Sequence, residues 1–129
     1  MRRTWPIIAV RDVPTSSWWY QSVLGCPNTH PDGSVFDQII DDDHTVLICL
    51  HRWGDHGHPS LLSADVAVPG NGLLLFFRVD DFEAVLTRTR ALEAELEEQP
   101  HINPNTGTME FSVRDPDGYF VTINEMPTG

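Results

Sequence analysis

The middle of the chain carries a cluster of imidazole and carboxylate groups that could bind a metal ion. His51, Asp55, His56 and His58 fall within eight residues, and Zn²⁺ is commonly bound in proteins by groups of these kinds. The spacing matches no rigid ligand frame, however, and the glycines between these residues favour a solvated loop that could act as a lid. The sequence leaves both interpretations open, a Zn or Ni site and a solvated loop.

Covalent catalysis has less support. Ser112 has no base near it in the sequence, and there is neither a G-x-S-x-G motif nor a glycine-rich phosphate loop. Cys49 lies in the apolar run 45–50, which predicts a buried thiol. Cys26 and Cys49 form no CxxC motif, and such a pair fits a reducing compartment. No catalytic residue is therefore assigned.

The charge of the chain limits its partners. The 129 residues include 8 Lys and Arg against 19 Asp and Glu, a net charge of −11. Nucleic-acid-binding proteins neutralise phosphates with basic side chains, so neither nucleic acid nor an anionic membrane is an expected partner. The field favours a cationic ligand, although acidic surfaces also serve solubility alone. No apolar stretch approaches a membrane span or a signal core, which predicts a cytoplasmic protein.

The elements that would position a site begin with a strand, a helix and a hairpin. A β-branched run over 6–13 predicts a strand, and a helix is predicted over 15–24, ending at Gly25. Strands over 35–40 and 45–52 follow and are predicted to pair as a hairpin.

The second half repeats this order. A buried strand is predicted over 73–79, followed by a helix whose apolar stripe runs from Phe82 to Leu96. Residues 93–98 are predicted as the solvated end of this helix, because Pro100 prevents its continuation.

The repeated order predicts an α+β fold. Its two modules span about 4–53 and 72–126, with a connecting loop over 54–71 in a single domain 1–129. Modules of this size would be marginally stable alone, so they are expected to pack together or to pair across a dimer.

Two motifs resemble the vicinal oxygen chelate superfamily, which includes glyoxalase I, extradiol dioxygenases and the fosfomycin- and bleomycin-resistance proteins. Predicted strands over 108–114 and 119–125 flank the turn 115–118, Asp-Pro-Asp-Gly, and look like the C-terminal hairpin of that superfamily. Segments 10–13 and 19–25 resemble its first strand and helix, whose usual form is V-x-D-hydrophobic followed by W/F-Y-x-x-x-L-G. The motifs occur in order over nearly the whole chain.

The resemblance implies two βαβββ modules that form a cupped mixed sheet around a cavity, usually in a homodimer. It also implies His, Glu or Gln metal ligands at positions that here hold Trp5, Ile48, Leu74 and Thr122. Three of these side chains have no donor atom for a metal, and a threonine hydroxyl is a weak one. The chain therefore resembles the metal-free, bleomycin-resistance-like branch, and no metal or other cofactor is expected.

Alternation along the strands extends these positions to a ligand-binding wall. The wall is apolar and aromatic with a few polar points, which is typical of small-molecule sites, while a filled core is the competing interpretation. The predicted ligand-binding residues are Trp5, Ile7, Phe36, Gln38, Ile48, Leu50, Trp53, Leu74, Phe76, Glu110, Ser112, Phe120 and Thr122. Segment 101–108 is the most polar approach to this wall, although its turn chemistry is also ordinary.

Two classes of function follow from the resemblance. The first is a small-molecule binding protein that sequesters an aromatic or cationic compound, such as an antibiotic, without converting it. The alternative is a glyoxalase- or dioxygenase-like enzyme, a lyase or isomerase with an unusual metal site or with Glu110 in acid–base chemistry. Metal analysis of protein purified without chelator discriminates between the two.

Overall fold

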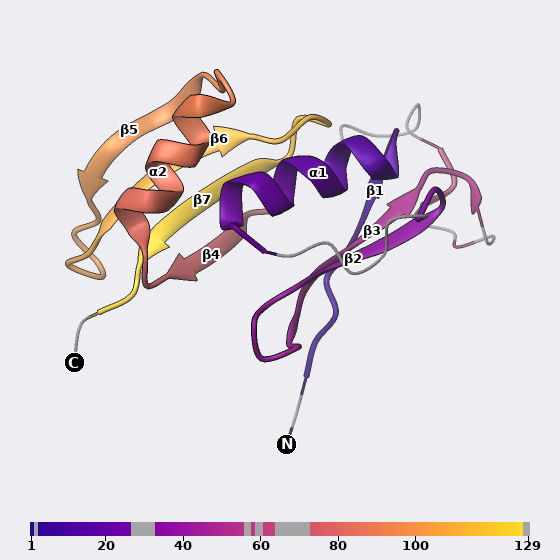
Figure 1. Cartoon of the computed structure of the whole chain (residues 1–129), viewed down its shortest axis with the longest axis horizontal. Helices are drawn as coiled ribbons and strands as arrows, with labels where there is room; N and C mark the ends of the chain where they lie inside the picture. Colours follow the sequence, from indigo (N-terminus) through magenta and orange to yellow (C-terminus); the bar gives the residue numbers. More distant parts are fainter. Residues whose placement is uncertain (2, 27–32, 56–57, 59–60, 64–72, 128–129) are drawn as a thin grey trace. The chain divides into compact units, whose positions relative to one another are not determined.

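Each half of the chain folds around its own mixed sheet (Figure 1). In the computed structural model, the described residues are 1, 3–26, 33–55, 58, 61–63 and 73–127. The chain divides into two compact units, 1–69 and 70–129. The predicted modules, about 4–53 and 72–126, fall within these units, and the α+β class is confirmed.

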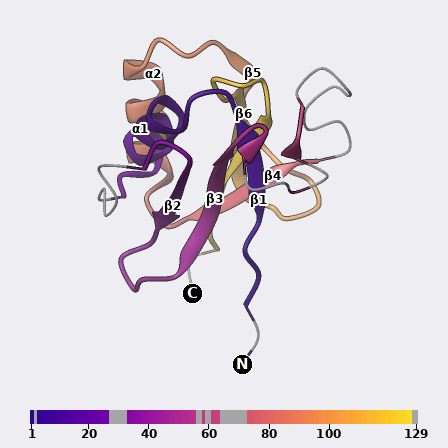
Figure 2. The same cartoon turned by 90° about the vertical axis from the view of Figure 1, so that its right-hand side faces the viewer.

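The first unit has β3 at the centre of a three-stranded sheet. Its elements are β1 (Ile7–Val10), α1 (Val13–Leu24), β2 (Phe36–Ile40) and β3 (Val46–Arg52). Figure 2 shows β2, β3 and β1 side by side; β1 pairs with β3 in parallel and β2 pairs with it antiparallel. A third strand after the helix, which the resemblance implies, would fall on residues that lie largely outside the described part of the chain.

Local sequence chemistry sets both ends of α1. The Asp12 carboxylate accepts the Thr15 amide at 3.0 Å and the Thr15 hydroxyl, so it caps the first turn. These hydrogen bonds, the hydroxyl first, hold the pKa of Asp12 below its ordinary value. Pro14 lies in the first turn, and Gly25 ends the helix with a φ of 73°.

A buried hydrogen bond joins α1 to the sheet of the first unit. The Ser17 hydroxyl donates to Asp37 Oδ2 at 2.5 Å, and Gln21 Nε2 donates to the Ser17 oxygen at 2.7 Å. The strand register places Ile8, Ile39, Ile48 and Leu50 on the same face as Asp37, beneath the helix. This face is the core of the unit, and all four of these apolar side chains are buried.

The second unit has the complete βαβββ order. Its elements are β4 (Leu75–Val79), α2 (Phe82–Ala91), β5 (Leu96–Ile102), β6 (Met109–Arg114) and β7 (Phe120–Glu125). The sheet order is β4-β7-β6-β5, with β4 and β7 parallel and the other pairs antiparallel. The helix packs on one face of the sheet (Figure 1). On this face the ring centroids of Phe82 and Phe111 lie 5.7 Å apart in an edge-to-face arrangement. The strands therefore have an apolar face toward α2 and an opposite face of different composition.

The predicted end of the second helix is wrong. The helix ends at Ala91, and Glu93 adopts a left-handed φ of 58°, so Leu96 belongs to β5 and not to the helical stripe. Pro100 lies in β5 between Glu98 and His101, where the pairing with β6 changes register. An edge strand accommodates proline at such an irregularity because no ladder hydrogen bond from its nitrogen is needed.

The helices of the described residues are short. They contain 12 and 10 residues, and none in this part of the chain is long and apolar enough to cross a membrane.

We expect Ser17→Ala to lower the free energy of unfolding by about 1.5–3 kcal/mol, because it removes a hydrogen bond to a buried carboxylate. Ser22→Ala is the matched control: its hydroxyl bonds the Trp18 carbonyl of the same helix in an exposed position. In Ser22→Ala the higher helix propensity of alanine offsets the loss of this hydrogen bond, so the free energy of unfolding is expected to change by no more than about 0.5 kcal/mol. Urea denaturation followed by circular dichroism measures both; equal effects would contradict this role for Ser17.

Candidate functional site

The face of the second sheet opposite α2, here called the polar face, carries a network of hydrogen-bonded side chains. Alternation places Phe76, Glu110, Ser112, Phe120, Thr122 and Asn124 on this face. Two rows of paired residues cross the strands. One row runs Glu98, Ser112, Thr122, Phe76 and the other His101, Glu110, Asn124, Arg78.

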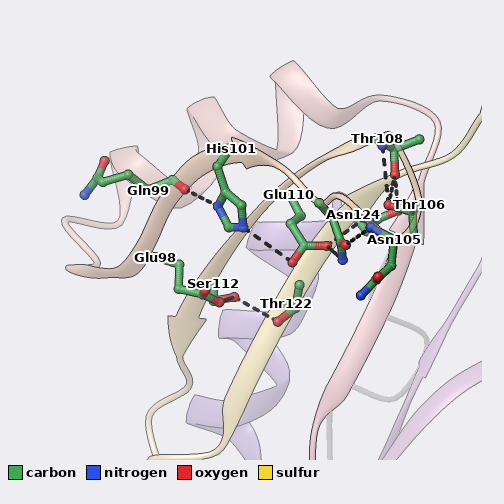
Figure 3. A network of polar contacts seen from close by, with 11 residues as sticks. Glu98, Gln99, His101, Asn105, Thr106, Thr108, Glu110, Ser112, Thr122 and Asn124 are labelled. Carbon is green, nitrogen blue, oxygen red and sulfur yellow. Dashed lines mark hydrogen bonds and ion pairs between the residues drawn. The ribbon is translucent and has the colours of Figure 1, made fainter.

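Glu110 is the most constrained charge on the polar face. It is 8% exposed, and its Oε1 accepts Nδ2 of Asn103 and Nδ2 of Asn124, each at 2.9 Å. Its Oε2 lies 3.7 Å from His101 Nε2. Figure 3 shows the His101 ring pointing toward this carboxylate. A nearly buried carboxylate is stable only with such donors, because burial removes the water that would otherwise solvate it.

Asn124 connects Glu110 to a cation on β4. Its side-chain oxygen accepts Arg78 Nε at 3.0 Å and the Thr108 hydroxyl at 3.1 Å, while its nitrogen donates to Glu110. Arg78 also donates to the Glu125 carbonyl at 3.3 Å. The amide is therefore bonded through both of its polar atoms, which fixes the orientation of the Glu110 carboxylate.

The neighbouring row is a chain of hydroxyl groups that ends on a carboxylate. The Ser112 hydroxyl donates to Glu98 Oε1 at 2.6 Å and lies 2.8 Å from the Thr122 hydroxyl (Figure 3). Because Ser112 has one hydroxyl hydrogen and a carboxylate only accepts, the Thr122 hydroxyl donates to Ser112. This arrangement positions the hydroxyl groups but supplies no imidazole base for Ser112.

Aromatic rings flank the polar groups. Phe76 is 41% exposed beside Thr122, and Phe120 lies on the adjacent strand. The Arg114 guanidinium stands 4.8 Å from the centre of the Phe120 ring. An exposed ring and a carboxylate on the same sheet face suit an organic ligand with both an aromatic and a cationic part.

The structure brings together the predicted site residues of the second unit. Phe76, Glu110, Ser112, Phe120 and Thr122 share the polar face. Leu74 precedes β4 and is exposed. Whether these residues bind a ligand stays a prediction.

The predicted site residues of the first unit divide between two faces. Ile7, Phe36 and Gln38 share the sheet face away from α1, whereas Ile48 and Leu50 lie in the core beneath the helix and are 0% exposed. The prediction that Ile48 and Leu50 of β3 share one sheet face with Ile7 is therefore wrong.

The register puts Cys49 and His51, not Ile48 and Leu50, on the face of Ile7. A continuous apolar strand shows no alternation, so the sequence could not distinguish its two faces. Trp5 precedes β1 and is exposed, and Trp53 follows β3 half-buried.

Three further polar residues contribute to the polar face. Glu98, which the sequence places at a helix end, belongs to β5 and faces Ser112, and His101 of the same strand faces Glu110. Asn103 follows β5, and its side chain reaches Glu110. His101 and Asn103 belong to segment 101–108, which the sequence leaves open between a polar approach to the wall and ordinary turn chemistry. The irregular register of β5 hides the period-2 pattern that would indicate Glu98 and His101.

The histidine cluster is described only in part. The ring centroids of His51 and His58 lie 5.1 Å apart in an edge-to-face arrangement. His51 Nδ1 lies 2.8 Å from the Arg52 carbonyl oxygen. His56 lies outside the described residues. Within the part of the chain that the structure describes, no group of three or more His, Cys, Asp or Glu side chains could hold a metal ion.

The positions that the resemblance relates to metal ligands do not fit a divalent ion. Ile48 is an alkyl side chain in the core of the first unit, and the Thr122 hydroxyl is engaged with Ser112. Trp5 and Leu74 have no donor suited to such an ion. No chemistry is therefore assigned through a metal at these positions.

A helix packed on one face of a mixed sheet, in βαβββ order, defines the fold class of the second unit. The sequence profile of the Glyoxalase/Bleomycin resistance protein/Dioxygenase superfamily matches residues 3–123. The chain belongs to this superfamily. No curated protein matches it.

Solved structures show the same fold at low sequence identity. A glyoxalase/bleomycin resistance protein/dioxygenase family enzyme from Burkholderia phytofirmans has a TM-score of 0.74 and 22% identity, over 95% of this chain and 97% of the other. A lactoylglutathione lyase from Agrobacterium tumefaciens has a TM-score of 0.68 and 20% identity, and the match covers 96% of this chain and 92% of the other. TioX from Micromonospora sp. ML1 has a TM-score of 0.69 and 17% identity, and the match covers 97% of this chain and 98% of the other.

We expect Cys49 to react slowly with iodoacetamide in the native protein. Burial raises the pKa of its thiol, with Gln38 Nε2 at 3.6 Å opposing this effect, so less thiolate is present at neutral pH. Cys26 is half-buried and is expected to react first. Mass spectrometry of Cys26→Ser and Cys49→Ser variants measures each rate; the Cys49 rate should increase as the pH is raised. Equal rates at pH 7.5 would contradict the prediction.

Proposed function

We propose that this protein binds a small organic ligand with an aromatic part and a cationic part, and that it sequesters the ligand without converting it. The observation that carries the proposal is the Glu110 carboxylate, which is nearly buried and fixed by two amide donors on one oxygen. A fixed carboxylate of this kind loses little freedom when a cation binds, which favours affinity.

The spacing of the polar face sets the size of the ligand. Phe76 and Glu110 lie two strands apart and two residues apart along the strands, which corresponds to about 12 Å between their Cα atoms. A ligand that reaches both is therefore of drug size, with at least one ring and a cation at some distance from it. The acidic charge of the chain, −11, favours the approach of such a cation.

Family membership supports binding but does not by itself distinguish binding from catalysis. The resemblance adds three further features to the proposal: an antibiotic as the ligand, a site without a metal ion, and a homodimer. The absence of a metal ion is supported by the side chains at the four positions related to metal ligands, because none of them suits a divalent ion. Turnover of the methylglyoxal–glutathione adduct by protein purified without added metal would contradict sequestration.

We expect Glu110→Gln to weaken the binding of cationic aromatic compounds by tenfold or more and to leave neutral analogues unchanged. A hydrogen bond to a charged group contributes about 1.5–3 kcal/mol, and about 1.4 kcal/mol corresponds to one factor of ten. A thermal-shift screen of aromatic amines and their alcohol analogues selects the probes, and calorimetry gives the dissociation constants.

Glu97→Gln is the matched control for Glu110→Gln. It removes the same charge from an exposed carboxylate that pairs with Arg114 at 3.5 Å, so it preserves Glu110 and its donors. Equal affinities of the wild type and both variants for an aromatic amine would place the binding site elsewhere.

We expect Trp5→Ala to retain the fold, because the Trp5 side chain is 57% exposed. Thermal unfolding followed by circular dichroism compares the variant with the wild type. Unfolding of the variant would assign Trp5 to the core.

A further inference from the structure

The two oxygens of the Glu110 carboxylate differ in their remaining capacity to accept hydrogen bonds. Oε1 accepts two amide hydrogens, from Asn103 and Asn124, at 2.9 Å each. Each carboxylate oxygen has about two acceptor positions, so those of Oε1 are filled. The contact of Oε2 with His101 Nε2 at 3.7 Å is longer than a hydrogen bond. Oε2 is thus the oxygen that can accept a donor from a ligand.

His101 is held so that it is a good partner for Oε2 only when it is protonated. Its Nδ1 lies 2.8 Å from the Gln99 carbonyl, which can only accept, so Nδ1 carries a hydrogen (Figure 3). In the neutral ring Nε2 is then an acceptor, and it faces a carboxylate that is also an acceptor. The His101 side chain is 41% exposed on the edge strand β5, so it can turn away without opening the core.

We infer that Glu110 Oε2 binds the cation of the ligand, that it selects an ammonium group over an amidinium or guanidinium, and that this cation replaces His101. The inference rests on the proposed function and names its ligand chemistry. An amidinium or guanidinium binds a carboxylate best through a fork to both oxygens. Here Asn103 and Asn124 occupy one of these oxygens. An ammonium group is a compact donor that needs a single oxygen.

The other charged groups on the polar face have partners other than His101. Arg78 is bonded to Asn124, Arg114 pairs with Glu97, and Glu98 accepts from Ser112. Among side chains, imidazole is the type that ordinarily gains a charge when the pH is lowered from 8 to 6. Imidazolium competes with the ligand cation, so ammonium binding should strengthen as the pH is raised from 6 to 8.

The first experiment compares benzylamine with benzamidine, using benzyl alcohol as the neutral control. Dissociation constants come from NMR titrations of the full chain at pH 8. We expect the wild type to bind benzylamine at least fivefold more tightly than benzamidine. Asn103→Ala, which frees an acceptor position on Oε1, should bring the ratio close to one. Asn105→Ala, in the same turn, is the matched control, because Asn105 bonds Asn103 through its backbone amide and not its side chain.

The second experiment varies the charge at position 101. His101→Gln is neutral at every pH and should remove the increase in benzylamine affinity between pH 6 and 8. His101→Lys carries a permanent cation and should lower that affinity several-fold at pH 8. Benzylamine remains protonated throughout, so its own charge does not contribute. Thermal unfolding of each variant verifies that the fold is retained.

Three outcomes are distinguishable. Equal binding of benzylamine and benzamidine by the wild type would overturn the selection of ammonium. A pH profile that persists in His101→Gln, with unchanged affinity in His101→Lys, would overturn the replacement of His101. In both of these cases loss of benzylamine binding in Glu110→Gln would still support the proposed function. Benzylamine binding that is unchanged in Glu110→Gln would overturn both proposals.

Discussion

A carboxylate that is nearly buried must be hydrogen-bonded, and this requirement organises the polar face of the second unit. Glu110 meets it with amide hydrogens from Asn103 and Asn124, which come from different parts of the chain. Asn124 is in turn bonded to Arg78 and Thr108. Hydrogen bonds therefore connect the β5–β6 turn, β7 and β4 to the Glu110 carboxylate, directly or through Asn124. Replacing any of these partners would remove one hydrogen bond and would also shift the position of the carboxylate charge.

The two sheets have different faces away from their helices. In the second unit this face contains carboxylates, hydroxyls and amides that bond one another. In the first unit it carries Ile7, Gln38 and Cys49, with the His51 ring at its end. The helix-facing sides are alike in being apolar cores, with the Ser17–Asp37 bond as a buried polar contact in the first. The helix-facing sides thus supply the apolar core of each unit, whereas the opposite sides differ in composition.

Motif and alternation predicted much of the fold and part of the candidate site. Gly25 marks the end of α1, as its sequence predicts, because capping chemistry is local. Alternation in β6 and β7 placed Glu110, Ser112, Phe120 and Thr122 on one face. The same reasoning failed for β3, whose residues 48–51 are buried on both faces. It also failed for β5, where the register with β6 changes twice along the strand.

The sequence by itself determined the superfamily, the order of elements and the positions of the polar residues on β6 and β7. These depend on turns, caps and period-2 patterns, which short segments carry on their own. The tertiary structure decided that Glu98, His101 and Asn103 join this face, and which oxygen of Glu110 is filled. The physical reason is that irregular pairing of an edge strand and side-chain bonds across a turn depend on the neighbouring strand. No pattern within the segment itself contains that information.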